Sequence, residues 1–145
     1  MEWFKGGKVE DVIALRLDYG DDIHRSVERF CKDEEIHTGV IVSGIGTLYK
    51  ARLHSIIATD FPGRDEILEM EGPIEISGIH GIVADYKPHM HFTIYNHDTG
   101  QVMAGHLEPG CLVLYLAELC LLKVSNLPLA RFHDREKNFL KLGRR

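Results

Sequence analysis

Hydrophobic and polar residues alternate along several segments of the chain, and this alternation predicts β-strands. Residues 8–20 (KVEDVIALRLDYG) approach a period of two before a glycine turn. Residues 38–57 are rich in β-branched side chains, and Gly44 and Gly46 within them indicate a bulge or a close backbone approach. Such a pair of glycines bends a sheet. Beyond a loop at Pro62 and Gly63, further strands are predicted at residues 66–72, 73–85, 88–107 (a hairpin) and 111–122.

One helix is predicted between residues 21 and 35. Asp21 or Asp22 can cap its first turn. Apolar side chains recur behind the cap at helical spacing, at Ile23, Val27, Phe30 and Cys31. The whole pattern predicts an α+β fold: a strongly bent, mostly antiparallel β-sheet with one main helix, in a single domain.

Length and charge divide the chain into a body and a tail. A chain of 145 residues has room for one domain with its own core, which we place at residues 1–130. Residues 131–145 hold six Lys/Arg and two Asp/Glu, a balance of +4, so the rest, with eleven basic and twenty acidic residues, carries −9. The body repels phosphate, and only the basic C-terminal tail could contact nucleic acid, weakly. The plainer interpretation of the tail is a solvated helix or a frayed end.

Several broad classes of protein and site are disfavoured by the sequence. The longest apolar run, residues 111–122, is shorter than a membrane span and contains Glu118, and the first five residues do not resemble a signal peptide. We therefore expect a cytoplasmic protein without membrane contact. Three cysteines form no C-x-x-C pair and are expected to be reduced thiols, at Cys31, Cys111 and Cys120. No Ser-His-Asp order, Walker loop or dinucleotide-binding fingerprint is present.

The hairpin at residues 88–107 carries the clearest candidate chemistry. In PHMHFTIYN the apolar residues alternate with His89 and His91, so both histidines point to the polar face. If residues 97–100 form a four-residue loop, counting back pairs His91 with His106. Directly opposed residues have Cβ atoms roughly 5 Å apart, so three imidazoles could bind one ion. Three neutral imidazoles suit zinc and leave a fourth position open for water or a small-molecule ligand.

The register of this hairpin decides between two interpretations. A three-residue loop with a bulge at Gly100 would turn His106 away from His91. The alternative to a metal site is a solvent-exposed strand whose histidines are unrelated, because the chain has nine histidines and such spacing can arise by chance. His54 and His80 are left undecided between the two. Turns, termini and other polar surroundings favour an ordinary structural role for His24, His37, His97 and His133.

Glu118 is the only charged residue in the apolar run 111–122, which predicts a buried carboxylate that needs a partner. Two roles are open to it. It could act as an acid/base or supporting group beside a metal, or form an ion pair at a subunit contact. The run itself is apolar on both faces, and a thin domain covers such a strand most easily by oligomerising.

The segment GRDEILEMEG (63–72) resembles the signature of the plants-and-prokaryotes-conserved (PPC) domain family. The opening strand and helix, PHMHF, GQVMAGHLEPGCLV and AEL resemble further motifs of the family, so the similarity covers about residues 8–125. Asp65 stands where the plant signature has an aromatic residue. The resemblance implies a mixed α/β fold, a homotrimer, a DNA-binding label for stand-alone prokaryotic members, and an interaction segment at Gly63, Arg64, Glu66, Ile67 and Leu68.

The fold is also similar to that of acetolactate decarboxylase, whose zinc is held by an H-x-H pair and a further histidine. This similarity implies metal-ligand roles for His89, His91 and His106. Two functions follow as hypotheses. The first is a trimeric regulatory or DNA-associated domain, in which no Arg-Gly-Arg-Pro hook is present to grip DNA. The second is a zinc-dependent enzyme that acts on a small anionic or carbonyl-containing metabolite.

Overall fold

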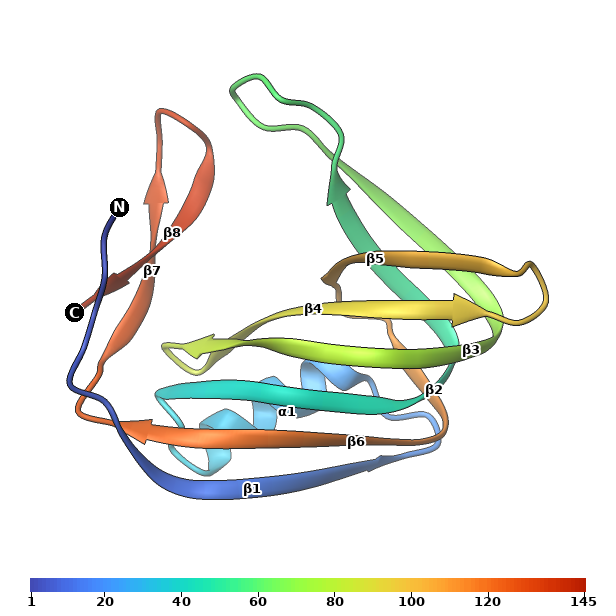
Figure 1. Ribbon diagram of the computed structural model, residues 1–145, viewed down its shortest axis with the longest axis horizontal. Coiled ribbons are helices and arrows are strands. Elements are labelled where there is room, and N and C mark those ends of the chain that lie inside the picture. Colours follow the sequence, from blue (N-terminus) through green and yellow to red (C-terminus); the bar gives the residue numbers. More distant parts are fainter.

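The computed structural model describes residues 1–145. Its elements in chain order are β1 (Lys8–Asp18), α1 (Ile23–Asp33), β2 (Thr38–Ile56), β3 (Asp65–Ala84), β4 (Lys87–Asn96), β5 (Gln101–Leu107), β6 (Leu112–Ser125), β7 (Leu129–Asp134) and β8 (Phe139–Arg144). One helix accompanies a strongly curved antiparallel sheet, which confirms the predicted α+β class (Figure 1).

The main sheet has the strand order β1-β6-β2-β3-β4-β5, and β2 pairs a second time, with β5. This second pairing closes β2, β3, β4 and β5 into a ring, because the long strand β2 turns sharply along its length. Gly46 lies at the turn, with φ +146° and a register shift beside it. A Cβ at Gly46 would lie 2.4 Å from the carbonyl oxygen of Leu116, so the close approach expected from the two glycines is confirmed.

The core lies between the curved sheet and α1. Asp22 caps the helix as predicted, since its carboxylate accepts a hydrogen bond from the backbone N–H of Arg25. The helix buries Ile23, Val27 and Cys31. Strand β4 alternates as its sequence requires, with buried Met90, Phe92 and Ile94 facing the same core.

Residues 65–84 form one strand where the sequence predicted two. The backbone at Gly72 has φ +119°, and the register shifts so that Gly72 and Pro73 lie opposite Tyr49 alone. A bulge of this kind bends a strand without ending its pairing, which is why a Gly-Pro boundary did not interrupt β3.

The C-terminal segment is neither a helix nor a frayed end, which corrects the expectation for residues 131–145. It forms the two-stranded sheet β7–β8, with Asn138 at φ +56° in the connecting turn. Asp134 accepts two backbone hydrogen bonds within that turn and pairs with Lys141. The hairpin stands on the same side of the main sheet as the tip of β2 and β3 (Figure 1).

The outer surface of β1, β6 and β2 is apolar and is not covered by the chain itself. The exposed apolar residues there are Val12, Ile45, Tyr115 and Leu116. Val40 and Val42 of β2 instead lie across a cavity from Leu140 and Leu142 of β8. Glu118 is exposed on the same strands, opposite Arg16 of β1 and Ile45 of β2, so the prediction of a buried carboxylate is wrong for the single chain. The alternation of β6 buries only its inner face.

All three cysteines are free thiols, as predicted. Burial raises the pKa of Cys31 and of Cys111 to about 12, which keeps both thiols protonated and unreactive. Helix α1 has 11 residues, and the structure contains no helix with the length and hydropathy of a membrane span.

Candidate metal centre

Four histidines lie in register across four neighbouring strands. His80 of β3 is paired with His91 of β4, His91 with His106 of β5, and His106 with His54 of β2. The pairing of His91 with His106 confirms the four-residue loop at residues 97–100, because Asn96 pairs with Gln101 at its base. The row exists because the ring of strands β2–β5 places both sheet neighbours of His106 beside it.

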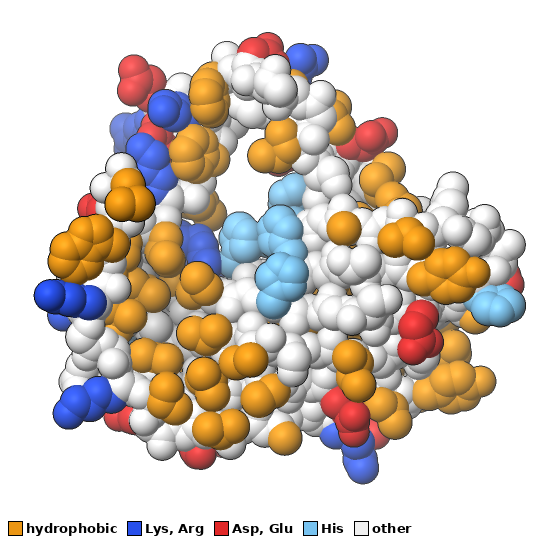
Figure 2. Space-filling model, viewed as in Figure 1, with side chains coloured by type: hydrophobic (Ala, Val, Ile, Leu, Met, Phe, Trp, Pro, Cys, Tyr) orange, Lys and Arg blue, Asp and Glu red, His pale blue; other side chains and the backbone are white.

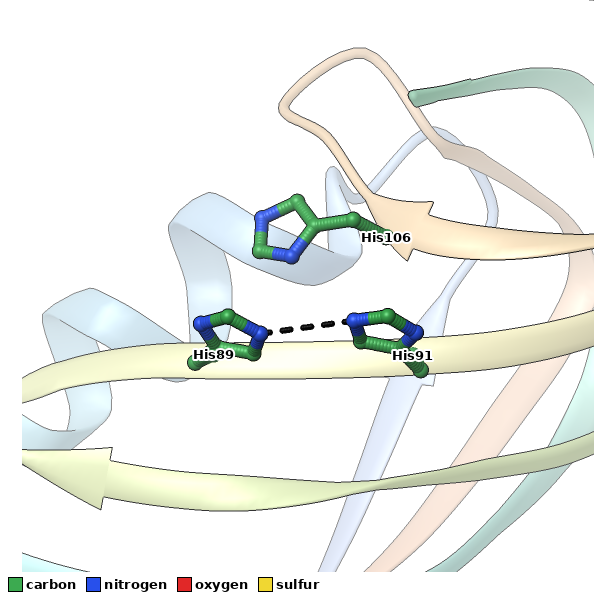
Figure 3. Close-up of side chains that lie close together, drawn as sticks. All are labelled: His89, His91 and His106. Atoms are coloured by element: carbon green, nitrogen blue, oxygen red, sulfur yellow. Dashed lines mark hydrogen bonds between the residues drawn. The ribbon is translucent and has the colours of Figure 1, made fainter. Parts of the chain in front are cut away.

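Two of these side chains, those of His91 and His106, converge with His89 at one end of the row. The ring centroids of His89 and His106 are 4.6 Å apart, and those of His91 and His106 are 5.5 Å apart. Figure 3 shows the ring of His106 above the gap between His89 and His91, with one nitrogen directed toward that pair. One nitrogen from each of His89, His91 and His106 lies within 4.8 Å of the other two.

The spacing of these nitrogens fits a tetrahedral metal ion. Nε2 of His89 and Nε2 of His91 are 3.3 Å apart. Two nitrogens bound to one zinc ion at about 2.0–2.1 Å in tetrahedral geometry lie roughly 3.3–3.4 Å apart. Nδ1 of His106 is buried and has no hydrogen-bond partner in the protein. A bound cation would satisfy this orphaned lone pair, so the donor set fits a divalent ion.

The electrostatics of the three side chains keep them neutral at pH 7. Burial, with the charges that His89 and His54 would carry, lowers the pKa of His106 to about 4. Burial also lowers the pKa of His89 and of His91, and in both cases neighbouring cationic side chains lower it further. A neutral imidazole offers a lone pair to a metal ion. The three side chains therefore have, without any metal, the protonation state that metal binding requires.

Two residues of the site were not identified from the sequence. The imidazole of His54 stacks on that of His106, with centroids 4.5 Å apart. Nδ1 of His54 lies 2.5 Å from Oε1 of Glu108, and both side chains are half-buried. Together with His106 they form a second group of possible metal donors. His54 was left undecided because only the pairing of β2 with β5 places it here, and Glu108 follows β5 in a loop.

The histidines line a cleft beneath two projecting hairpins (Figure 2). One cavity of about 830 Å³ reaches from His89, His91 and His106 to the tips of both hairpins, where Lys137 Nζ lies 5.2 Å from the ring centre of Phe61. A second cavity of about 650 Å³ extends from His89 and His91 along β2 and β8. Leu140 borders both. The three histidines are therefore reachable by a small molecule.

The remaining predicted residues lie outside the histidine cluster. Glu118 belongs to neither group of possible metal donors. The predicted interaction segment, at Gly63, Arg64, Glu66, Ile67 and Leu68, occupies the tip and start of β3 and is exposed except for half-buried Leu68. Gly63 lines the larger cavity, and Arg64 pairs with Asp60. His24, His37, His97 and His133 take no part in either group of donors.

Solved structures share this fold over nearly the whole chain. A metal-containing protein from Archaeoglobus fulgidus is 29% identical, with a TM-score of 0.82 over 97% of this chain and 98% of the other. A protein from Ralstonia eutropha JMP134, named as a candidate DNA-binding protein, is 27% identical, with a TM-score of 0.73 over 90% and 89% of the two chains.

A curated relative and a family profile extend the comparison to sequence. The bifunctional protein GlmU of Synechococcus sp. (strain JA-2-3B'a(2-13)) is 29% identical over 131 residues, which are 90% of this chain. The chain spans about a fifth of the length of such relatives. The profile of the Plants and Prokaryotes Conserved (PCC) domain matches residues 4–125, in agreement with the resemblance of the sequence motifs. The chain therefore belongs to the Plants and Prokaryotes Conserved (PCC) domain family.

Proposed function

We propose that this chain binds a divalent metal ion, zinc, through His89, His91 and His106, and that the ion takes a small-molecule ligand from the cleft. The observation that carries the proposal is the convergence of three neutral imidazoles, one with an orphaned buried nitrogen, at the floor of a cavity. A structural zinc site is closed by four protein ligands, whereas three ligands leave a position for water or a ligand.

Two further observations support this choice of ion and role. The related protein from Archaeoglobus fulgidus is named as metal-containing. Imidazole-only donor sets favour zinc over magnesium or calcium, which prefer oxygen. A bound zinc ion would supply a Lewis acid to the cleft. Glu108 would hold the imidazole of His54 in one orientation, so that this pair could accept or release a proton beside the ligand.

A DNA-associated role is the second candidate. It is favoured by the name of the relative from Ralstonia eutropha and by the six basic residues of residues 131–145. The chain as a whole carries −5, and phosphate binding through a few exposed basic residues is weak and salt-dependent. This role would use the outside of the β7–β8 hairpin and leave the metal cleft free.

The chain is also proposed to assemble as a homotrimer through the apolar surface of β1, β6 and β2. Large exposed apolar patches mark interaction sites in soluble proteins. Tyr115 at 74% exposure and Val12 at 66% would otherwise remain in water. In this assembly Glu118 would lie in the subunit contact and need a cationic partner. Arg16 lies opposite Glu118 on the neighbouring strand but is paired with Asp18, so it would have to exchange partners to fill that role.

The test of the metal proposal is cobalt substitution. The protein is stripped with chelator, titrated with Co²⁺, and followed by visible absorption, because tetrahedral Co²⁺ absorbs far more strongly than octahedral Co²⁺. We expect one equivalent to give an intense tetrahedral spectrum that changes when a small anion such as azide enters the open position. A weak octahedral spectrum would contradict the three-histidine site, and a tetrahedral spectrum that no anion perturbs would contradict the open position.

A further inference from the structure

The smaller cavity beside the metal ligands has apolar walls and a single basic side chain. Its walls come from β2 and β3 on one side and β8 on the other, and include Val40, Val42, Ile82, Leu140 and Leu142. Arg131 of β7 is the only lysine or arginine that lines it, and no aspartate or glutamate does. The cavity thus combines an apolar surface with one positive charge.

The guanidinium of Arg131 has no carboxylate partner. Nη1 donates a hydrogen bond to the carbonyl oxygen of Lys87 (3.3 Å), and Nη2 donates one to that of Ile82 (3.2 Å). No acidic side chain lies within ion-pair distance. A guanidinium has five N–H donors, so three remain free after these two bonds. The half-buried guanidinium of Arg131 is thus held in place by two carbonyl oxygens, and its positive charge is not balanced by an anion.

Arg131 is close to the metal ligands. Arg131, His89 and His91 line the same cavity. The walls between them are unusually apolar for a surface: Val42 is 52% exposed and Leu140 is 59% exposed. A ligand that covered these side chains would remove them from water while its charged end met the guanidinium.

We propose that Arg131 anchors the carboxylate of a small monocarboxylate whose apolar tail lies along Val42 and Leu140, beside the metal ion. One guanidinium matches one carboxylate, both in charge and in its forked hydrogen-bonding geometry. A phosphate dianion would find only one cation, and an uncharged ligand would leave Arg131 unpaired. The inference rests on the proposed function, because the anchored molecule lies in the cleft from which the metal ion takes its ligand.

The experiment measures binding of hexanoate and of hexanamide, its uncharged counterpart, to the full chain by calorimetry, with zinc content determined in every sample. Arg131→Gln removes the charge, and Arg135→Gln is the matched control, because Arg135 lies exposed in the turn of the same hairpin. We expect hexanoate to bind at least about tenfold more tightly than hexanamide, and Arg131→Gln to abolish that preference. Arg135→Gln should leave it unchanged.

A second pair of variants keeps Arg131 and its hydrogen bonds in place. Leu140→Glu adds a negative charge to the wall of the cavity, whereas Leu140→Gln adds a side chain of the same shape without the charge. We expect hexanoate to be weakened more by Leu140→Glu than by Leu140→Gln, and hexanamide to be affected equally by both. These Leu140 variants test the anchor even if Arg131→Gln detaches the β7–β8 hairpin from the sheet.

The outcomes separate the anchor from the metal. Hexanoate binding with the same affinity in the wild type and Arg131→Gln, or equal binding of hexanoate and hexanamide by the wild type, overturns the anchor whether or not zinc is present. A preference for hexanoate that depends on Arg131 in a protein that retains no zinc supports the anchor and overturns the proposed metal function. A protein that binds zinc in full but shows no preference for hexanoate supports the proposed metal function and overturns the anchor.

Discussion

His91 on β4 and His106 on β5 are directly opposed partners in the antiparallel ladder, with ring centroids 5.5 Å apart. This pairing makes His89, two residues along β4, a diagonal neighbour of His106. Because His97 lies in the turn of the same hairpin, it is too far from the cluster to contribute a ligand.

Single replacements of the three histidines test this arrangement. We expect His89→Ala, His91→Ala and His106→Ala each to weaken zinc binding by more than about tenfold, because loss of a mere supporting group already costs that much. His97→Ala is the matched control and should bind zinc like the wild type. The measurement is elemental analysis combined with chelator titration. Full occupancy in His106→Ala, or an equal loss in His97→Ala, would show that the histidines do not act together.

Zinc affinity should depend on pH in a direction set by the shifted pKa values. Protons compete with the metal only where an imidazole is charged, and the folded pKa values of His89, His91 and His106 all lie below the ordinary histidine value. Affinity should therefore stay constant above about pH 6.5 and fall below it. Competition titrations at several pH values measure this. Loss that begins well above pH 7 would mean that the folded pKa values are raised rather than lowered.

The metal-free protein should lose stability in acid because of His106. Its pKa is about 4 when folded and about 6.5 when unfolded, so the unfolded chain binds the extra proton between these values. The free energy of unfolding should fall from about pH 6.5 down to about pH 4. The free energy of unfolding of the His106→Asn variant, measured by urea denaturation, should fall less steeply with decreasing pH over the same range. Identical pH dependence in the variant and the wild type would contradict a buried neutral imidazole at His106.

The proposed homotrimer should dissociate when a charge is placed on the apolar surface of β1, β6 and β2. Leu116, 40% exposed on β6, lies in that surface, whereas Val102, 68% exposed on β5, lies outside it. We expect Leu116→Lys to give monomers, since an unpaired charge would be buried in the contact, and Val102→Lys to leave the trimer intact. Light scattering across dilutions gives the mass. A wild-type monomer at all concentrations would refute the assembly.

Duplex DNA should bind weakly at most. Because Arg131 holds the β7–β8 hairpin to the sheet, neutral substitutions test the basic tail better than a truncation. The logarithm of the DNA-binding constant falls linearly with the logarithm of the salt concentration. We expect Arg135→Ser and Lys137→Ser each to reduce the magnitude of that slope by about one. Fluorescence anisotropy measures this. Sub-micromolar binding by the double variant near physiological salt would place the contact elsewhere.

The bend of β2 makes a prediction for stability. Gly46→Ala forces a Cβ against the carbonyl oxygen of Leu116, at a positive φ, and should lower the free energy of unfolding by about 2–4 kcal/mol. Gly78→Ala is the matched control on β3, where an added Cβ meets nothing within 4 Å. Equal stability of the two variants in chemical denaturation would mean that β2 can relax at the bend.

Local patterns determined the hairpin and its three histidines. Alternation places His89 and His91 on one face of a strand, and the length of the loop sets which residue lies opposite His91. Both depend only on neighbours in the sequence, which is why the register at residues 88–107 could be predicted. The capping of α1 by Asp22 is local in the same sense.

Only the tertiary structure decided what surrounds them. His54 reaches His106 because β2 bends at Gly46 and pairs with β5, a contact between distant segments that no local pattern specifies. Exposure of Glu118 depends on what covers β6, and a single strand cannot indicate that. The C-terminal hairpin docks through hydrogen bonds from Arg131 to carbonyl oxygens of Lys87 and Ile82, which any sequence would supply. Long-range backbone pairing is sequence-tolerant, and so the cleft had to be seen in the fold.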